Sequence, residues 1–278
     1  MIRRPPRSTQ GVSAAASDVY KRQQFILVSC TEQNDPLINK ANEEWIQGHN
    51  HSALELLNEV LQKNPSGSKA EEALFRIGEI HHFSLNDSTR ALMFFQEVRQ
   101  MNPQGPFGYK AQKYIAEIAE FGLKDYDQAI IEYQNLINYK KDFSNGDHQY
   151  RIASIYYKKQ NYEQALMELE ILLETYPKSS WVEETKFKII EILYTLNRCP
   201  EVRNQYRDFN LEYSKSHFKS EIDFVMASCL EEEGHLQDAY NRFKALEGQY
   251  TYPSISVSYT HLRAHETRHD LVCRLLLE

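Results

Sequence analysis

Glycine and proline are scarce in this sequence, where they account for 10 and 9 of 278 residues. Both residues interrupt regular secondary structure, so their scarcity favours long regular elements that are joined by short turns. The sequence also contains no run of eighteen apolar residues, which is about the length that a membrane-spanning helix needs. It contains no GxGxxG or Walker-type glycine loop, which argues against a nucleotide site. With 41% hydrophobic and 26% charged residues, the composition is typical of a globular domain.

Basic residues are fewer than acidic ones in the central part of the chain. Residues 24–256 carry a formal net charge of −11, because the two ends contribute +4 and 0 to the total of −7. Binding to nucleic acid depends on clustered Lys and Arg side chains. The sequence therefore predicts no nucleic-acid partner.

The stretch from Gly146 to Pro177 has the apolar spacing of two helices, which are separated by a polar turn at residues 159–161. Pro177 cannot continue the second helix, because it lacks an N–H and its ring clashes with the preceding turn. Ala153 and Ala165 lie where the two helices should cross, and their small side chains allow a close approach. The stretch predicts a helical hairpin with one apolar side on each helix. Such a hairpin needs neighbours of its own kind to bury both sides.

The same pattern recurs along the chain. A small residue opens the second helix of each hairpin at intervals of 36 to 38 residues: Ala53, Ala91, Ala129, Ala165, Val202 and Ala239. A large residue follows four positions later and an apolar residue seven positions later in every unit. Proline ends three units twelve positions after this marker: Pro65, Pro103 and Pro177. Six units in register predict a repeat array. The expected helices are 36–47, 51–64, 69–83, 88–101, 108–121, 126–140, 147–160, 162–175, 181–197, 200–213, 218–233 and 236–250.

This pattern resembles the tetratricopeptide repeat, most closely over residues 146–177, and the resemblance covers residues 35–253 as one repeat domain. It implies an all-α fold, a right-handed α-α superhelix of about six helical hairpins. Ala153 and Ala227 join the small residues above as packing positions of the repeat. The fifth unit departs from the pattern, because Val202 and Ile190 stand where small residues are expected. We therefore expect its hairpin to be splayed or rotated.

The resemblance implies a non-enzymatic scaffold that binds a protein or an extended peptide in a concave groove, which the first helices of the hairpins line. It implies no cofactor and no metal. The candidate groove residues are Tyr150, Ser154, Tyr157, Lys158, Glu184, Glu191, Tyr194, Ser228 and Glu231. Aromatic anchors and charged rims would hold the partner there.

Residues 24–34 contain a short apolar run that ends in Leu27-Val28-Ser29-Cys30. These four residues resemble the lipobox of bacterial lipoproteins, in which the cysteine carries the lipid and the following polar residues form a tether. We interpret the segment as the end of a truncated lipoprotein signal. With the repeats, it resembles the outer-membrane lipoproteins that assist β-barrel assembly and the periplasmic repeat proteins of the cell-division complex. The expected location is the bacterial periplasm, with lipid as the sole membrane anchor. The alternative is a soluble cytoplasmic adaptor.

Both ends of the chain stand apart from the repeats. Residues 1–23 carry five basic residues against one acidic residue and have no apolar period. A basic arm or a targeting peptide is one interpretation. The segment instead resembles translated sequencing-adapter DNA, as do residues 254–278. We interpret both as non-native, and we expect residues 1–23 to be disordered.

The tail contains an HExxH pattern, His265-Glu266-Thr267-Arg268-His269. On a helix, two histidines at this spacing can share a zinc ion, with the glutamate as general base of a hydrolase. Only nine residues follow His269, so a downstream third ligand does not fit. The pattern also falls within the adapter-like tail, and we therefore reject the zinc hydrolase in favour of the scaffold.

Two cysteines lie within the repeats, Cys199 in the turn of the fifth hairpin and Cys229 in the first helix of the sixth. They could pair if the protein is periplasmic. We interpret them as small apolar packing residues, which is the commoner role of such cysteines.

Overall fold

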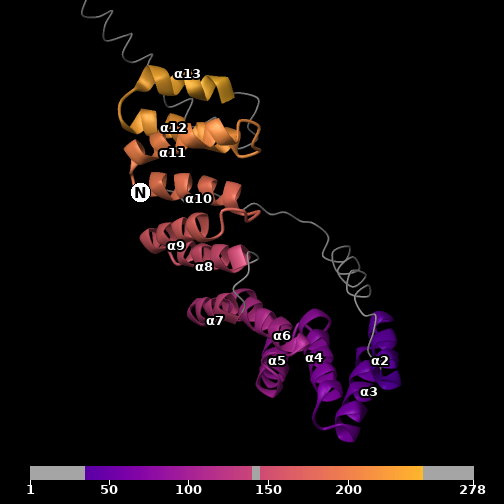
Figure 1. Ribbon diagram of the computed structural model, residues 1–278. Helices are drawn as coiled ribbons and strands as arrows, with labels where there is room; N and C mark the ends of the chain where they lie inside the picture. The colour runs from indigo at the N-terminus through magenta and orange to yellow at the C-terminus, as the bar shows by residue number, and fades with distance from the viewer. Residues whose placement is uncertain (1–34, 140–144, 247–278) are drawn as a thin grey trace, which may run out of the picture. The chain divides into compact units, whose positions relative to one another are not determined.

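The structure is a computed structural model that describes residues 35–139 and 145–246 (Figure 1). Every regular element in these ranges is helical. The helices fall into two compact units, which divide after Ile118. The first unit contains α2 (Pro36–Ile46), α3 (Asn50–Lys63), α4 (Ser68–Phe83), α5 (Ser88–Met101) and α6 (Pro106–Glu117). The second contains α7 (Tyr126–Tyr139), α8 (Gly146–Lys158), α9 (Tyr162–Thr175), α10 (Val182–Thr195), α11 (Cys199–Glu212), α12 (Lys219–Glu232) and α13 (Leu236–Leu246).

The prediction of an all-α fold built from sequential hairpins is confirmed. Most helix ends lie within two residues of the predicted ones. The main difference lies at residues 118–123, where the chain forms a short π-helix, η2 (Ile118–Leu123), in place of the end of an α-helix. A π-turn admits one more residue than an α-turn. None of the helices in the described ranges combines the length and apolar character needed to cross a membrane.

In the first unit, the repeat markers form the contacts between paired helices. Ala53, Leu57 and Val60 of α3 pack in one apolar cluster with residues of α2 and α4. A second cluster joins α4 and α5 to α6 around Phe75 and Phe95. Gly78 of α4 lies against the Phe95 ring, where an added Cβ would come within 2.8 Å of a ring carbon. Any larger residue at position 78 would therefore force the Phe95 ring to shift.

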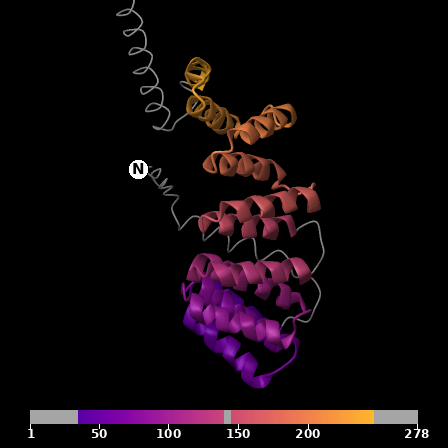
Figure 2. The ribbon, with the colours of Figure 1, turned by 90° about the vertical axis from the view of Figure 1, so that its left-hand side faces the viewer.

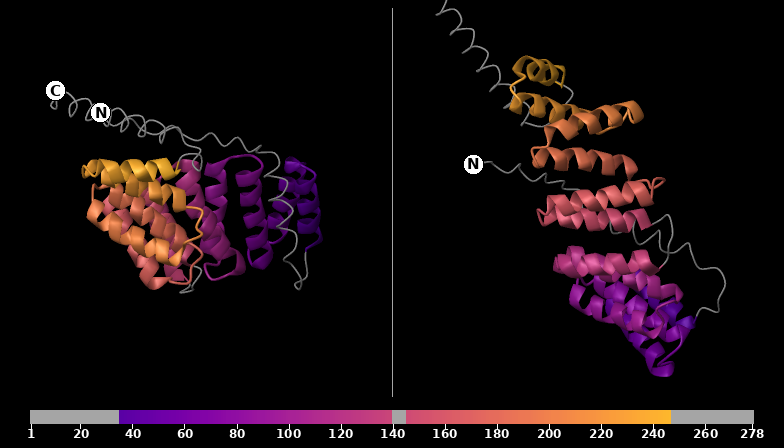
Figure 3. Two further views of the ribbon diagram at one scale, coloured as in Figure 1. Left: turned by 90° about the horizontal axis from the view of Figure 1, so that it is seen from above. Right: turned by 60° about the vertical axis from the view of Figure 1, so that its left-hand side comes forward.

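In the second unit, α8 and α9 lie side by side (Figures 2 and 3), and the predicted crossing residues Ala153 and Ala165 are 1% and 0% exposed. The seven alanines that the repeat pattern singles out are all buried: Ala53, Ala91, Ala129, Ala153, Ala165, Ala227 and Ala239. Each of Pro65, Pro103 and Pro177 stands directly after the residue that caps a helix C-terminus. The predicted packing and stop positions of the repeat thus lie where the hairpin geometry requires them.

Each hairpin turn contains one residue with positive φ, five positions before the repeat marker. These residues are Gly48, Asn86, Lys124, Gln160, Asn197 and Gly234, with φ between 51° and 87°. A left-handed residue ends a helix and reverses the chain within a few positions. The repeat is therefore encoded in the backbone of the turns as well as in the packing residues.

The fifth hairpin is looser than its neighbour. Helices α10 and α11 make fewer close contacts than α8 and α9 do. Val202 and Ile190 are both fully buried, so their larger side chains lie between the helices. This arrangement agrees with the prediction of a splayed fifth hairpin.

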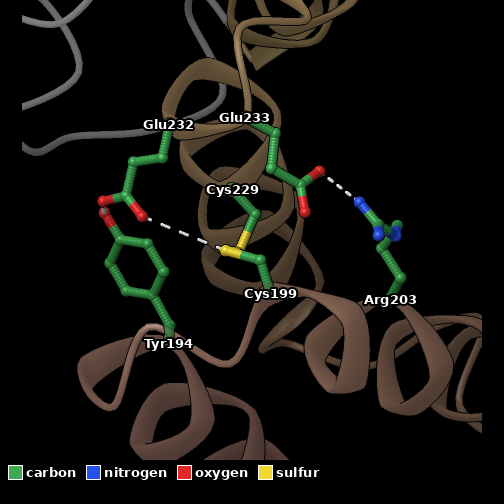
Figure 4. The surroundings of a disulfide bond; sticks show 6 residues. All are labelled: Tyr194, Cys199, Arg203, Cys229, Glu232 and Glu233. Atoms are coloured by element: carbon green, nitrogen blue, oxygen red, sulfur yellow. Dashed lines mark hydrogen bonds and ion pairs between the residues drawn. A yellow bond between two sulfur atoms is a disulfide. The ribbon is translucent and has the colours of Figure 1, made fainter.

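The interpretation of Cys199 and Cys229 as separate packing residues is wrong, because their sulfurs form a disulfide bond with a Cα–Cα distance of 5.5 Å (Figure 4). Cys199 is the first residue of α11 and Cys229 lies in α12. The bond joins residues 30 positions apart and ties the fifth hairpin to the sixth.

Candidate partner-binding surface

The nine predicted groove residues lie on the first helices of the fourth, fifth and sixth hairpins. Tyr150, Ser154, Tyr157 and Lys158 belong to α8, Glu184, Glu191 and Tyr194 to α10, and Ser228 and Glu231 to α12. All three helices belong to the second unit. We call these nine residues the α8–α10–α12 surface.

At one end of this surface, α8 and α10 are joined by aromatic side chains that donate to carboxylates. The Tyr150 hydroxyl donates to Glu184 Oε1 at 2.7 Å. The Trp181 ring stacks on the Tyr150 ring with a centroid distance of 4.3 Å, and its Nε1–H donates to Asp147. Burial and, next, the adjacent Glu184 raise the pKa of Tyr150, so the hydroxyl remains protonated and continues to donate.

In the middle of the surface, α8 and α10 meet through a cation. Lys188 Nζ lies 5.1 Å from the centre of the Tyr157 ring and 2.6 Å from a carboxylate oxygen of Glu191. Burial, followed by the Glu191 charge, raises the pKa of Tyr157. Lys188 thus neutralises Glu191 and covers one face of Tyr157.

At the other end, α10 is joined to α12. The Tyr194 hydroxyl donates to Glu232 Oε1 at 3.0 Å. Burial and, next, the Glu232 charge raise the pKa of Tyr194 to about 12, so this hydroxyl also stays protonated near neutral pH. Glu231 was the predicted groove residue here, whereas the carboxylate that accepts from Tyr194 is that of Glu232.

Lys158, Tyr150 and Ser228 are among the predicted residues that are engaged or buried within the protein. Lys158 Nζ lies 2.5 Å from Oε1 of Glu120, a carboxylate that is 1% exposed and also accepts from the Tyr133 hydroxyl. Tyr150 and Ser228 are each 6% exposed, so their side chains offer little area to a partner. Tyr157, Tyr194, Glu184 and Glu191 are half-buried and keep part of their side chains open.

The charge of this surface is unevenly compensated. Within residues 35–139 and 145–246, neither Glu184 nor Glu232 forms an ion pair, whereas Glu191 is paired with Lys188. Among the described residues, the side chains that donate to Glu184 and Glu232 are tyrosine hydroxyls, which are neutral. The two ends of the surface therefore keep an uncompensated negative charge beside an aromatic ring.

Sequence reasoning missed Trp181, Lys188 and Glu232. A signal for part of this set exists, because the aromatic donor and its carboxylate are about one repeat apart. Tyr150 and Glu184 are separated by 34 residues, and Tyr194 and Glu232 by 38. A search for tyrosine–carboxylate pairs at the repeat period would have found both.

Other candidates are outside this surface. A surface hollow on the same unit is lined by Tyr206, Arg207, Asn210, Leu211 and Lys219, none of which was predicted. In the part of the chain that the structure describes, no group of three or more His, Cys, Asp or Glu side chains is placed to hold a metal ion. The predicted lipobox Leu27-Val28-Ser29-Cys30 and the HExxH pattern at His265, Glu266 and His269 lie outside the described residues.

The stacked hairpins and their spacing define a helical-repeat protein. Residues 72–105 and 149–179 match the family model of the tetratricopeptide repeat. The fold is similar to that of a tetratricopeptide repeat protein from Parabacteroides merdae, with a TM-score of 0.53 and 16% identity over 83% of this chain and 86% of that chain. It is also similar to YrrB, a tetratricopeptide repeat protein with an unusual peptide-binding site. That likeness has a TM-score of 0.50 and 14% identity, and covers 77% of this chain and 99% of that one. No curated protein matches the sequence.

Proposed function

We propose that the protein is a non-enzymatic scaffold that holds an extended segment or a helix of a partner protein on the α8–α10–α12 surface. The observation that carries this proposal is the placement of tyrosine rings and tyrosine-held carboxylates on successive first helices, at Tyr150–Glu184 and Tyr194–Glu232. Such helices present one side chain set per repeat, which suits a partner that runs across several repeats. The peptide-binding site named for YrrB supports the same use of the fold.

The partner segment carries basic side chains together with apolar ones. Glu184 and Glu232 have tyrosine donors and no ion pair among the described residues, so a Lys or Arg side chain of a partner would supply the missing positive charge. The half-buried ring of Tyr194 offers area for aliphatic stems and for cation–π contact. Exposed charge pairs are screened by salt, so the affinity should fall as ionic strength rises.

The experiment is fluorescence anisotropy with a panel of labelled fifteen-residue peptides, which are basic and aromatic, acidic and aromatic, or neutral. We expect the basic peptides to bind best and the double substitution Glu184→Lys, Glu232→Lys to weaken them at least tenfold. The matched control is Glu174→Lys, an exposed charge reversal on α9, which should change binding little. Preference for acidic peptides, or equal effects of the two charge reversals, would contradict the proposal.

We further propose that the scaffold works in the bacterial periplasm, attached to the outer membrane through a lipid on Cys30, in an envelope complex of the β-barrel-assembly or cell-division type. Two features support this location. Disulfide bonds such as Cys199–Cys229 persist in oxidising compartments and are rare in the cytosol. The lipobox-like Leu27-Val28-Ser29-Cys30 precedes the first repeat. A single acyl chain anchors only marginally, so stable attachment requires more than one chain.

This location is tested by metabolic labelling with a palmitate analogue after a complete signal peptide is placed before residue 24. The wild type should be labelled and enter the detergent phase, while Cys30→Ser should be unlabelled. Absence of label from both would contradict the lipid anchor and leave a soluble scaffold whose compartment the labelling does not determine. Alkylation of free thiols in intact cells gives an independent check, because a cytoplasmic adaptor would have reduced Cys199 and Cys229.

A further inference from the structure

The last hairpin meets the rest of the second unit through a few buried apolar residues and through polar contacts, among them the hydrogen bond from Tyr206 to Asp223. Its own core consists of Ala227, Ala239 and Phe243, and this cluster is separate from the large core of the unit. From α12, only Ile222, Val225 and Cys229 enter the large core as buried residues. One of these three is the cysteine that bonds to Cys199. The disulfide adds a covalent tie to these non-covalent contacts.

The geometry points to a thiol–disulfide exchange site at Cys199–Cys229 whose redox state sets the shape of the α10–α12 end of the α8–α10–α12 surface. The expected effect on partner binding rests on the proposed function, whereas the expected movement of α12 on reduction rests on the disulfide alone. The reductant is a dithiol, free or carried by a thiol–disulfide oxidoreductase. One of its thiolates attacks one sulfur of the pair, which breaks the Cys199–Cys229 bond, releases the other cysteine as a thiolate and leaves a mixed disulfide. The second thiol of the reductant then attacks the reductant's own sulfur in the mixed disulfide and releases the remaining cysteine. Two protein thiols and one reductant disulfide result, so electrons and protons balance.

The disulfide lies between two polar contacts that cross the same joint (Figure 4). On one side, Glu232 Oε1 accepts from the Tyr194 hydroxyl, and Glu232 Oε2 lies 4.0 Å from Cys199 Sγ. On the other side, Arg203 of α11 forms an ion pair with Glu233, the residue that follows α12. Cys229 precedes Glu232 by three residues, which is about one helical turn. The disulfide therefore fixes the turn of α12 that presents Glu232 to Tyr194.

The bond is protected while the joint is closed. Cys199 is 5% exposed and Cys229 is 0% exposed, so an attacking thiolate has little access to either sulfur. The Glu232 carboxylate beside Cys199 also repels an approaching thiolate, because both are negative. Reduction thus requires α12 to move away from the start of α11. After reduction, no covalent bond holds α12 against the start of α11. The Tyr194–Glu232 hydrogen bond then breaks as α12 moves away.

Hydrogen exchange measured by mass spectrometry tests the structural part on the full chain, oxidised and after reduction with dithiothreitol. We expect amides of α12 and α13 to exchange at least about tenfold faster after reduction, and those of α8 and α9 to be unchanged. The double variant Cys199→Ser, Cys229→Ser should exchange like the reduced protein and should not respond to dithiothreitol. Unchanged exchange in α12 and α13 on reduction, or free thiols in the untreated protein, would overturn the inference.

Two further measurements separate this inference from the proposed function. Glu232→Gln should speed reduction by dithiothreitol severalfold, whereas Glu221→Gln, at the other end of α12, should leave the rate unchanged; equal rates would overturn the protective role of Glu232. The basic peptide that binds best should bind the oxidised protein more tightly than the reduced protein. Equal binding in both states would overturn the regulation and leave the scaffold intact. If hydrogen exchange depends on the redox state but no peptide of the panel binds, the scaffold function would be overturned and the thiol–disulfide exchange site would stand.

Discussion

The Tyr150 hydroxyl donates to Glu184 across 34 residues of sequence, at 2.7 Å. The same relation recurs elsewhere, because Tyr194 donates to Glu232 across 38 residues. In the first unit, the Tyr114 hydroxyl and Glu79 lie 3.4 Å apart and are separated by 35 residues. These spacings are close to one repeat, and each pair joins the first helices of neighbouring hairpins. Apolar packing within a hairpin does not by itself fix where the next hairpin lies, and these directional bonds help to fix it.

Tyr150→Phe should lower the free energy of unfolding by about 1 kcal/mol, because it removes one hydrogen bond to a carboxylate and keeps the ring. Chemical denaturation measures this change. The control is Tyr162→Phe on α9, whose ring contacts Tyr157 and whose hydroxyl has no hydrogen bond among the described residues. We expect the control to stay within about 0.5 kcal/mol of the wild type. Equal effects of the two substitutions would show that the bond to Glu184 adds nothing.

Ala165→Leu should destabilise the protein by roughly 1–3 kcal/mol, because it forces extra methylene groups into a packed crossing of α8 and α9. Ala165 is 0% exposed. The matched control is Ala245→Leu, the same change at an exposed position of α13. Thermal unfolding should show a clear decrease in melting temperature for the first variant alone. Wild-type stability in the Ala165 variant would contradict the packing of this hairpin.

Gln160→Gly should raise the free energy of unfolding by about 0.5–1 kcal/mol. Gln160 has a φ of +61°, where a side chain is strained and glycine is not. The reverse test is Gly48→Ala, at a φ of +87°, which should be destabilising by about 1 kcal/mol. A Cβ at Gly48 would meet nothing within 4 Å, so its cost comes from the backbone alone. A destabilised Gln160→Gly variant would mean that the turn does not require the left-handed conformation.

Stability should depend on pH through Glu79, whose pKa is raised mainly by burial and only partly offset by the adjacent Arg76. The folded state then binds this proton more tightly than the unfolded state does. Relative to Glu79→Gln, the wild type should lose stability as pH rises above the ordinary value of 4.5, by up to about 1.4 kcal/mol per pH unit, until the folded-state pKa is passed. Urea denaturation of both proteins between pH 4.5 and 8 measures the difference. A constant difference across this range would contradict the raised pKa.

Much of the fold could be predicted from sequence, because a helix crossing tolerates only small side chains. This constraint placed Ala53, Ala129 and Ala239 in register, and all are fully buried. The turn residues carry the same period, yet glycine fills only two of the six positions with positive φ, so composition alone could not reveal it. The π-turn of η2 was not predicted, and a regular helix was expected to continue to residue 121.

The helices that carry the candidate surface could be predicted from sequence, but not every residue on that surface could. Glu231 and Glu232 are both polar and adjacent at the end of α12, and successive helical residues differ by about 100° in direction. Which of them faces Tyr194 depends on the rotation of α12 about its axis. The disulfide could not be predicted for a similar reason, because the Cα–Cα distance of 5.5 Å between Cys199 and Cys229 depends on how α11 and α12 pack. Sequence spacing does not determine that packing.

A map of backbone NMR shifts, measured as the best-binding basic peptide of the panel is added to the oxidised protein, tests the α8–α10–α12 surface directly. We expect the largest shifts on α8, α10 and α12, around Tyr157, Glu184, Tyr194 and Glu232. The outer helix α9, including the 53% exposed Met167, should change little. Shifts concentrated on α9 and α11, with Tyr194 and Glu232 unaffected, would contradict the assignment of the α8–α10–α12 surface as the place where a partner binds.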